Sequence, residues 1–293
     1  MKVLVLGSKG QLGLCLADQL DHTEHEVIYT SRTEIDIGQL ESTKEKIRYS
    51  NPDVVINASA YTAVDQAESD KEAADLINHL AVASIAEICA DLHCWLIHIS
   101  TDYVFDGLAT KPYLETDNPN PQGSYGLSKL NGEIKIQAST CKFIIIRTTW
   151  VFSEYGNNFM KTMLILGTDQ KEISVVGDQV GCPTYAQDLA KAIVSVVSRV
   201  SNDKLVSGIY HYSGDLPCTW YEFAESIFCE AKKLGYSIPD TLIPINTNEY
   251  PTPASRPAYS VLDNSKFENQ FGFPASNWHD GIKETISAID ILI

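Results

Sequence analysis

Tyr125 and Lys129 lie four residues apart in the segment Tyr-Gly-Leu-Ser-Lys, at the start of a predicted helix. This spacing places both side chains on one face of the helix. A tyrosine has an ordinary pKa of about 10, which is too high for efficient acid–base chemistry at neutral pH. A nearby ammonium favours the phenolate and lowers that pKa. Alone, the spacing is also typical of an ordinary solvated helix face.

A hydroxyl group precedes this pair in the segment Ile99–Phe105, which reads Ile-Ser-Thr-Asp-Tyr-Val-Phe. The segment ends a predicted strand, and open α/β sheets bind ligands beyond the carboxyl ends of their strands. Thr101 could orient a carbonyl oxygen beside Tyr125, or it could bond its own backbone. Acting together, Thr101, Tyr125 and Lys129 would form a catalytic trio. Hydride would pass from a reduced nicotinamide to a carbonyl carbon while Tyr125 donates a proton to the oxygen.

A glycine-rich turn, Gly7-Ser-Lys-Gly-Gln-Leu-Gly13, follows the first predicted strand and opens a helix. Glycines allow a tight turn and let backbone N–H groups approach a pyrophosphate at the helix N-terminus. A plain strand-to-helix turn could use the same residues, but the position favours dinucleotide binding. The second predicted strand ends without the acid that would hold an adenosine ribose. Arg32 at that end could bind the 2′-phosphate of NADP or be a surface cation, so we expect NADPH or NADH, with a slight preference for NADPH.

Apolar runs alternate with helical patterns through the first half of the chain and would position these residues. Strands that are apolar throughout, with helices between them, indicate a parallel sheet covered on both faces. The predicted fold is therefore α/β, a Rossmann-type doubly wound parallel sheet. The predicted strands are Val3–Leu6, Val27–Tyr29, Val54–Ile56, Trp95–Ile99 and Phe143–Ile146; the helices are Leu12–Leu20, Leu40–Tyr49, Leu127–Ala138 and a long one with the face Ala74, Ile77, Ala81, Ile85 and Ile88.

After about residue 150 the pattern loosens, which suggests a smaller C-terminal lobe interleaved with the sheet. Thr219 and Glu222 form a capping box for one helix, and Gly235 suits its C-terminal end. The stretch Pro244–Pro257 is rich in Pro and Thr and predicts an irregular loop. Helices are predicted at Phe159–Leu166, Leu189–Val197, Trp220–Leu234 and Trp278–Ile291.

Composition excludes several classes of protein. The net charge of −16 disfavours a general nucleic-acid binder. No stretch approaches the roughly 20 apolar residues of a membrane span, and the N-terminal apolar run is too short for a signal peptide. The seven scattered cysteines indicate reduced thiols and a cytoplasmic protein. Cys89, His93, Cys94 and His98 lie close together in sequence, but their spacing fits no zinc pattern, so no metal is expected.

With these motifs in place, the chain resembles the dTDP-4-dehydrorhamnose reductases, a family of the extended short-chain dehydrogenase/reductase superfamily. The resemblance covers nearly the full length. Its glycine turn and Tyr–Lys segment alone would indicate only the superfamily, whereas the whole set is specific to the family. The matching segments are 7–13, 57–68, 100–107, 125–133, 147–150, 156–159, 178–184 and 251–257.

The resemblance implies a dinucleotide-binding domain over residues 1–150 and, over 151–293, mainly a sugar-nucleotide-binding lobe interleaved with it. It implies reduction of the C4 keto group of dTDP-4-dehydro-L-rhamnose to dTDP-L-rhamnose by NAD(P)H, the last step of making this donor for cell-surface polysaccharide. The alternatives are a reductase or epimerase of another nucleotide sugar, or a non-catalytic regulatory subunit similar to the methionine adenosyltransferase β-subunit. NADH versus NADPH, the exact sugar and base, the oligomeric state and the glycan that receives the product stay open.

The resemblance also assigns site residues. Trp150 by itself could be core packing or a stacking platform, and the resemblance favours the pocket. Arg256 could bind a phosphate or lock the fold, and both roles stay open. The implied substrate contacts are Thr101, Asp102, Trp150 and Arg256; the implied cofactor contacts are Gly7, Gly10, Gln11, Leu12, Gly13, Arg32, Asp36, Ile37, Ala58, Ser59, Ala60, Tyr125 and Lys129.

The chain departs from the family pattern at two places. Some members form a dimer bridged by Mg²⁺ through glutamates, and the matching positions here are Cys15 and Gln187. Neither side chain suits a hard cation that prefers carboxylate oxygen, so we expect no Mg²⁺-bridged dimer, although another homodimer would remain open. Ser59 replaces the middle residue of a common Ala-Ala-Ala run, a change that we expect to be tolerated.

Overall fold

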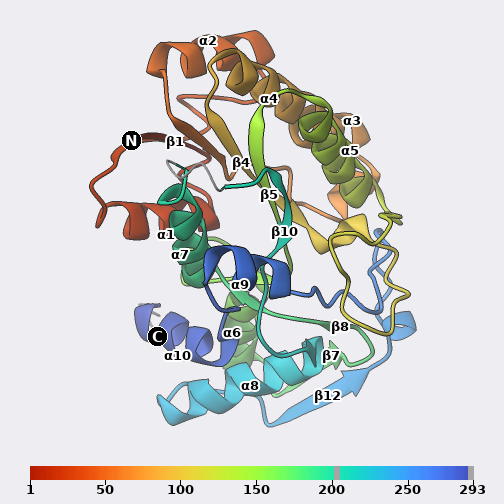
Figure 1. The fold of residues 1–293 in the computed structure, drawn as a ribbon. Helices are drawn as coiled ribbons and strands as arrows, with labels where there is room; N and C mark the ends of the chain where they lie inside the picture. Colours follow the sequence, from red (N-terminus) through yellow and green to blue (C-terminus); the bar gives the residue numbers. More distant parts are fainter. Residues whose placement is uncertain (201–204, 290–293) are drawn as a thin grey trace.

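A six-stranded parallel sheet runs through the larger part of the molecule (Figure 1). The computed structural model describes residues 1–200 and 205–289. The strand order is β10-β5-β4-β3-β1-β2, so the direction of the connections reverses between β1 and β3. This confirms the predicted α/β, Rossmann-type sheet, and the reversal is where such sheets bind ligands. The strands are β1 (Lys2–Leu6), β2 (Glu26–Thr30), β3 (Val54–Asn57), β4 (Trp95–Thr101), β5 (Lys142–Thr148) and β10 (Gly208–His211).

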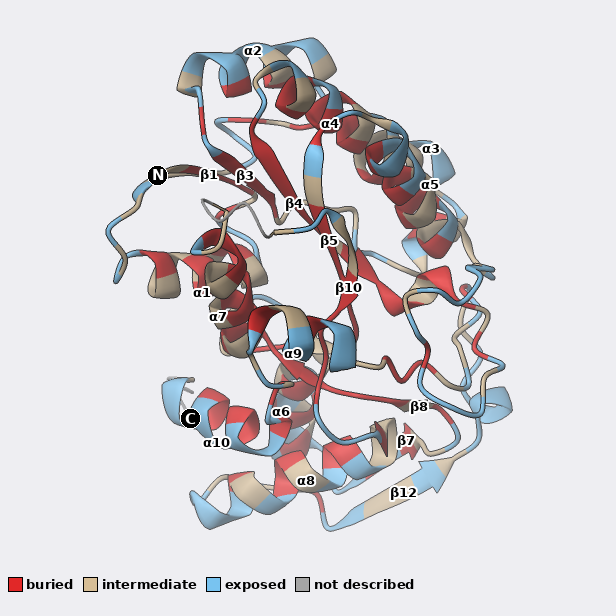
Figure 2. Ribbon diagram, viewed as in Figure 1, coloured by how far each residue is buried: buried red, intermediate tan, exposed pale blue. Residues whose placement is uncertain are grey.

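Helices cover both faces of the sheet, and Figure 2 shows their buried sides turned toward it. Successive strand residues point to opposite faces. Val3 and Val5 therefore pack with one helical layer, whereas Leu4 and Leu6 pack with the other. This is why the predicted strands are apolar at every position. One layer holds α1 (Gln11–Leu20) and α7 (Ala186–Val197); the other holds α2 (Leu40–Ser50), α4 (Ala81–Asp91) and α5 (Ser124–Ala138).

The predicted long helix is continuous from Lys71 to Asp91, but one turn of it is widened. It comprises α3 (Lys71–Asp75), the π-helical turn η2 (Leu76–Leu80) and α4. The helix has 21 residues, and an 18-residue window of it has a mean hydropathy of 1.3. By length and composition it is apolar enough to cross a membrane, which corrects the expectation that no such stretch exists. Half of that window is buried inside the protein, so its apolar face is used to cover the sheet.

A smaller lobe packs below the sheet around its own apolar core (Figure 1). The predicted capping box is confirmed: the Thr219 side chain accepts from the Glu222 backbone N–H, and the Glu222 carboxylate accepts from the Thr219 N–H. Gly235 follows the end of this helix with a φ of +85°, a left-handed conformation typical of a glycine cap. The lobe holds α6 (Phe159–Asp169), β7 (Glu172–Val176), α8 (Trp220–Lys233), β12 (Thr241–Ile245) and α10 (Trp278–Ala288).

Several elements differ from the sequence predictions. The predicted loop Pro244–Pro257 begins as strand, because β12 extends to Ile245 and pairs only with β7. Proline is compatible with such an edge strand. The closing helix ends at Ala288, and the predicted end at Ile291 lies outside the described residues. Elements that the sequence did not predict are β6 (Val151–Phe152), β7 (Glu172–Val176), β8 (Val180–Gly181), β9 (Thr184–Tyr185), β10 (Gly208–His211), β11 (Cys218–Thr219), α9 (Ser265–Phe271), and the 3₁₀ turns η1 (Gln66–Glu68), η3 (Asp102–Val104) and η4 (Thr247–Glu249).

The second half of the chain also returns to the large sheet. Helix α7 packs on α1, and β10 extends the sheet beside β5, with His211 opposite Arg147. Strand β10 has only four residues and begins with glycine, which explains why its pattern was too weak to predict. Residues beyond 150 therefore contribute elements to the large sheet as well as to the small lobe.

Candidate active site

One cleft of about 1080 Å³ opens at the carboxyl ends of β1, β3, β4 and β5. Its walls contain every predicted cofactor and substrate residue except Gly13 and Arg256. The predicted site residues, which are spread over 150 positions of the sequence, thus meet in one place. The cleft lies at the reversal of strand order, where parallel sheets bind nucleotides.

The glycine turn forms one end of this cleft. Gly7 has a φ of +83°, which glycine adopts without strain, and its N–H and that of Ser8 both donate to the Thr30 carbonyl. A Cβ on Gly13 would lie 2.2 Å from the Gly7 carbonyl oxygen, so Gly13 supports the turn from behind rather than lining the cleft. No side chain caps Gly10 at the start of α1, and no acidic residue lies in the first turn. The helix N-terminus is thus available to an anion.

Arg32 lies where the cleft reaches the end of β2. Its side chain is 87% exposed, and its Nε lies 3.7 Å from the Asp36 carboxylate. The nearby Glu34 is turned back on its own loop, because the Ser31 N–H and hydroxyl donate to its carboxylate at 2.8 and 2.7 Å. Arg32 therefore presents its cation to the cleft, and that arrangement suits a phosphate better than a ribose hydroxyl.

Tyr125 lies in the first turn of α5 and meets Thr101 at the end of β4. The Thr101 side chain is close enough to influence the phenol. Burial raises the pKa of Tyr125 well above its usual value; the Thr101 contact opposes this, and the charge of Asp102 adds to it. The phenol is thus held in its protonated form.

Lys129 does not lower the pKa of Tyr125, which corrects the sequence prediction. Its buried ammonium points to the backbone of β4 instead, where Nζ donates to the Ile99 carbonyl at 2.6 Å. Burial lowers the pKa of Lys129 to about 8, and the charge of Glu133 partly opposes that shift. The spacing of four placed both residues on one helix face, as predicted, but the long side chain follows the strand rather than the phenol.

Asp102 forms a buried wall of the cleft next to Thr101. Its carboxylate accepts from the Thr101 hydroxyl at 2.9 Å and from the Thr149 hydroxyl at 2.8 Å. Burial raises its pKa, while hydrogen bonds from Thr149, Ser260 and Thr101 oppose the shift. The carboxylate therefore fixes the orientation of Thr101. The sequence predicted Asp102 as a substrate contact but not these partners.

Trp150 combines the two roles that the sequence left open. Its ring lines the cleft and also stacks on Trp220 of the small lobe, with the ring centroids 3.5 Å apart. Its backbone has a φ of +47°, a left-handed conformation that is rare for a large side chain. Such strain persists only where surrounding structure enforces it, and it is concentrated at functional sites.

Arg256 does not line the cleft. Its guanidinium pairs with the Asp65 carboxylate at 2.7 Å, and the Ala254 N–H donates to the same carboxylate at 3.2 Å. A second guanidinium nitrogen lies 3.4 Å from the Tyr103 hydroxyl. Of its two predicted roles, these contacts favour the fold-locking one, because they tie the proline-rich loop to the segment after β3.

Two further interactions support the catalytic helix and were not predicted. The Glu68 carboxylate caps α5, accepting from the Ser124 N–H at 2.7 Å and from its hydroxyl at 3.0 Å. Deeper along α5, Glu133 and Arg147 form a buried ion pair with two hydrogen bonds, of 3.0 and 2.7 Å. Both lie in segments that carried the family resemblance, which was the only available signal for them.

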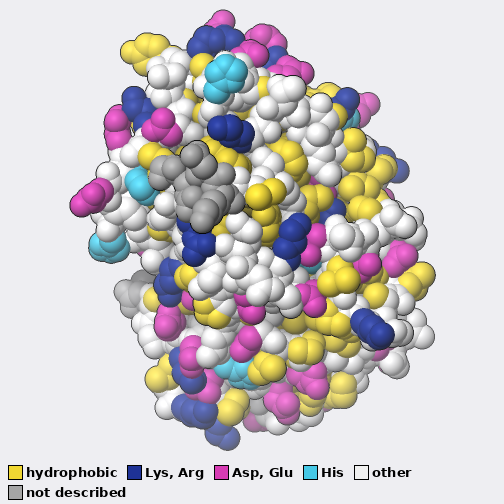
Figure 3. Space-filling view, in the orientation of Figure 1, with side chains coloured by type: hydrophobic (Ala, Val, Ile, Leu, Met, Phe, Trp, Pro, Cys, Tyr) yellow, Lys and Arg dark blue, Asp and Glu magenta, His cyan; other side chains and the backbone are white. Residues whose placement is uncertain are grey.

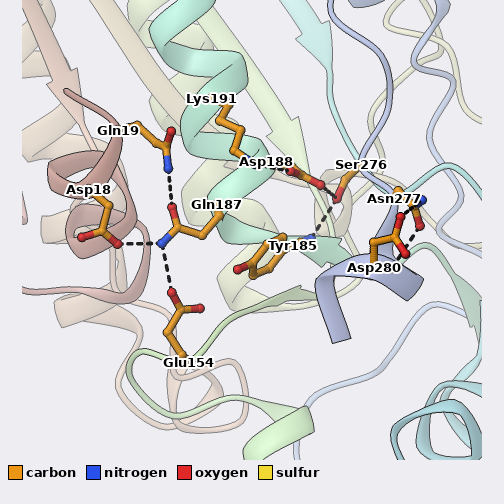
Figure 4. Close-up of polar contacts among 10 residues, drawn as sticks. All are labelled: Asp18, Gln19, Glu154, Tyr185, Gln187, Asp188, Lys191, Ser276, Asn277 and Asp280. Atoms are coloured by element: carbon orange, nitrogen blue, oxygen red, sulfur yellow. Dashed lines mark hydrogen bonds and ion pairs between the residues drawn. The ribbon is translucent and has the colours of Figure 1, made fainter. Parts of the chain in front are cut away.

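The positions matched to metal ligands in relatives do not fit a cation. Figure 4 shows Gln187 between two carboxylates: its amide nitrogen donates to Asp18 at 2.6 Å and to Glu154 at 2.9 Å. Its amide oxygen accepts from Gln19 at 2.9 Å. Cys15 is buried, and burial raises the pKa of its thiol to about 12. An N–H donor thus occupies the place between the acids that a cation would need.

The glycine turn at one end of a Rossmann cleft, and the Thr–Tyr–Lys set at the other, define an NAD(P)H-dependent oxidoreductase. The family model described as the RmlD substrate binding domain matches residues 1–291. The chain belongs to this family, that of the dTDP-4-dehydrorhamnose reductases, which confirms the sequence resemblance.

Individual relatives match over nearly their whole length. The chain is 41% identical over 286 residues to dTDP-4-dehydrorhamnose reductase of Aggregatibacter actinomycetemcomitans, covering 96% of this chain and 97% of that protein. A crystal structure of such a reductase from Clostridium acetobutylicum superposes with a TM-score of 0.92 at 38% identity, covering 99% and 100% of the two chains. A reductase from Bacillus anthracis in complex with NADP gives 0.90 at 34% identity, covering 98% of each.

Proposed function

We propose that this protein reduces the C4 keto group of dTDP-4-dehydro-L-rhamnose to dTDP-L-rhamnose with NAD(P)H, as the last step in making that sugar donor for cell-surface polysaccharide. The observation that carries the proposal is the protonated Tyr125 phenol, which lies beside Thr101 in the cleft that also holds the glycine turn. The relatives named as dTDP-4-dehydrorhamnose reductases supply the substrate.

The cofactor fits the cleft through residues of its first half. The N-terminus of α1 and the turn after β1 would hold the pyrophosphate, and Ala58, Ser59 and Ala60 would line the path between the two nucleosides. Arg32 favours NADPH, and the relative bound to NADP agrees with this preference. When bound, the reduced nicotinamide supplies a hydride to the carbonyl carbon.

The chain's own residues supply the proton and hold the substrate. Tyr125 retains its proton at neutral pH because burial raises its pKa, so it can donate to the C4 oxygen as charge develops there. The Thr101 hydroxyl, oriented by Asp102, shares that hydrogen bond by turning toward the oxygen. Lys129 carries a proton at neutral pH, because its pKa is about 8, and it would hold a hydroxyl of the cofactor ribose.

The sugar nucleotide would lie between the sheet and the small lobe. Trp150, supported by Trp220 of α8, would form a platform there for the base or the sugar. Residues 1–150 would hold the dinucleotide and residues 151–293 mainly the substrate, with α7 and β10 belonging structurally to the first part. We also propose a cytoplasmic enzyme, since all seven cysteines are free and six are buried.

Two features support a small-molecule enzyme rather than a nucleic-acid protein. On the face drawn in Figure 3, basic side chains are scattered among acidic ones. The net charge of −16 would repel a phosphate backbone. A homodimer remains part of the proposal, but not one bridged by Mg²⁺ through Gln187.

The test is oxidation of NADPH and of NADH by the purified protein, measured with dTDP-4-dehydrorhamnose and a panel of dTDP- and UDP-ketosugars. We expect turnover with dTDP-4-dehydrorhamnose and formation of dTDP-rhamnose. Turnover only with another ketosugar would replace the substrate, and dinucleotide binding with no turnover on any of them would favour the regulatory-subunit alternative.

A further inference from the structure

His98 of β4 is a buried histidine beside Lys129 and has no part in the mechanism above. Its Nε2 is 3.4 Å from Lys129 Nζ, and its Nδ1 is 3.2 Å from Asn57 Nδ2. His98 and Lys129 are both almost completely buried, so water cannot rearrange these contacts freely. The donors and acceptors of this chain must therefore be matched within the protein.

The hydrogen of His98 can be assigned from its neighbours. The Asn57 amide oxygen accepts from the Ser59 backbone N–H at 3.1 Å, so the Asn57 amide nitrogen is the atom that faces His98. This nitrogen is a donor, so His98 Nδ1 must accept. Burial, together with the charge of Lys129, lowers the pKa of His98, so the ring is neutral and its one hydrogen is on Nε2. That N–H points at Lys129 Nζ.

We propose that His98, held by Asn57 in the tautomer with hydrogen on Nε2, is a positioning residue that makes Lys129 release its proton more readily. An imidazole N–H facing an ammonium leaves two donors opposed. Facing a neutral amine, the same N–H donates to the nitrogen lone pair. The arrangement therefore favours the neutral form of Lys129 over the ammonium. This inference deepens the proposed function and rests on it for its kinetic part.

The other charged groups near Lys129 do not act in this way. Glu133, one turn further along α5, favours the ammonium, but Arg147 of β5 already pairs with both of its oxygens. Asp102, beyond the end of β4, accepts from Thr101 and Thr149. His98 differs from these groups in two ways. Asn57 determines which of its nitrogens carries the hydrogen, and its contact with Lys129 is unfavourable for the ammonium and favourable for the neutral amine.

Two substitutions of similar size separate the two contacts of His98. In His98→Gln the side-chain amide N–H can occupy the place of Nε2 and keep the donor to Lys129. In His98→Asn the shorter side chain reaches only the place of Nδ1, so the contact with Asn57 can survive while the donor to Lys129 is lost. The pH profile of kcat/KM for the reductase reaction is measured for both variants and the wild type.

We expect the alkaline limb of the His98→Asn profile to move up by about one pH unit, which is about a tenfold gain relative to wild type above the limb. His98→Gln should keep the wild-type limb. An unmoved limb in His98→Asn, or an equal movement in both variants, would overturn the proposal, since a merely structural role shifts no limb.

A second measurement needs neither a variant nor turnover. Nitrogen NMR of the wild-type protein labelled with ¹⁵N-histidine, with NADPH bound, reports which ring nitrogen of His98 carries the hydrogen. We expect Nε2 to carry the hydrogen, with Nδ1 as the acceptor. A hydrogen on Nδ1 would contradict the inference. Because this result does not depend on the substrate, it stands even if the enzyme reduces another ketosugar, and it decides the matter if both variants fail to fold.

Discussion

Two buried cations, Lys129 of α5 and Arg147 of β5, lie in the larger part of the molecule, and the protein treats them differently. Arg147 donates to both oxygens of Glu133, and the Ser100 hydroxyl adds a third hydrogen bond of 2.5 Å to the same carboxylate. Among the residues that the structure describes, Lys129 has no carboxylate partner at hydrogen-bonding distance. It donates to one backbone carbonyl and faces the His98 ring.

The difference separates a structural charge from a chemical one. A buried ion pair that is fully hydrogen-bonded offsets much of the cost of burying its charges, and breaking it is expensive. The buried ammonium of Lys129 keeps a lowered pKa, because the charge of Glu133 offsets the effect of burial only in part. Arg147 and Glu133 thus hold the helix on the sheet, whereas Lys129 keeps a proton that it can lose near neutral pH.

The largest expected effect comes from Tyr125, the proton donor proposed for the reaction. Tyr125→Phe removes the phenolic proton and should lower kcat by about 10²- to 10⁴-fold, the usual contribution of a general acid. NADPH affinity, measured by fluorescence titration, should survive because the ring remains. Unchanged steady-state rates would remove Tyr125 from its assigned role.

Breaking the structural pair should cost stability. Glu133→Gln leaves the Arg147 charge buried and unpaired, so the free energy of unfolding in urea should fall by about 3–5 kcal/mol. The matched control is the double variant Glu133→Gln with Arg147→Met, which removes both charges and should recover a large part of that loss. Equal stability of the single variant and wild type would contradict the structural role.

Removing the Lys129 ammonium should affect activity more than stability. Lys129→Met keeps the length of the side chain but removes the ammonium, so kcat/KM should fall by about 10- to 100-fold, and NADPH should bind more weakly. Stability should change by less than about 1 kcal/mol, since an uncompensated buried charge is lost together with its carbonyl hydrogen bond. A loss of stability as large as that of Glu133→Gln would erase the contrast between the two cations.

The pH profile sharpens the same contrast. The pKa of Lys129 is lowered from 10.5 to about 8, so the ammonium is present below pH 8 and is lost as the pH rises through that value. Activity should therefore fall along an alkaline limb near pH 8, while Tyr125, with its raised pKa, still holds its proton. The folded protein binds fewer protons than the unfolded chain between about pH 8 and 10.5, so this group's contribution to stability rises with pH there. A flat profile from pH 7 to 10 would contradict the assignment.

The smallest expected effect concerns the cap that positions the helix. Glu68→Ala removes two hydrogen bonds from the start of α5 and should cost about 1 kcal/mol of stability. Turnover should fall only a few-fold, because Tyr125 keeps its packing against Tyr103. Thermal unfolding and steady-state rates measure the two effects, and Glu68→Gln, which retains an acceptor, is the control. A loss as large as that of Tyr125→Phe would place Glu68 in the chemistry.

The amino-acid sequence by itself determined the features that depend on neighbouring residues. The glycine turn at residues 7–13, the apolar strands and the Thr219–Glu222 capping box follow from local sterics and from periodicity, and the structure has each of them. The approach of Tyr125 to Thr101 was predicted as well, because each residue is placed by its own helix or strand end. Short elements such as β10 were missed, since four residues carry too little pattern.

Only the tertiary structure decided how the site residues are charged and paired. The direction of Lys129 follows from its hydrogen bond to β4, and the raised pKa of Tyr125 follows from burial and the charge of Asp102; no spacing along α5 reveals either. Likewise, Arg256 pairs with Asp65 across 191 positions of sequence, and Gln187 meets Asp18 across 169. Proton affinity depends on the groups that surround a side chain in space, and the sequence identifies those groups only after the chain has folded.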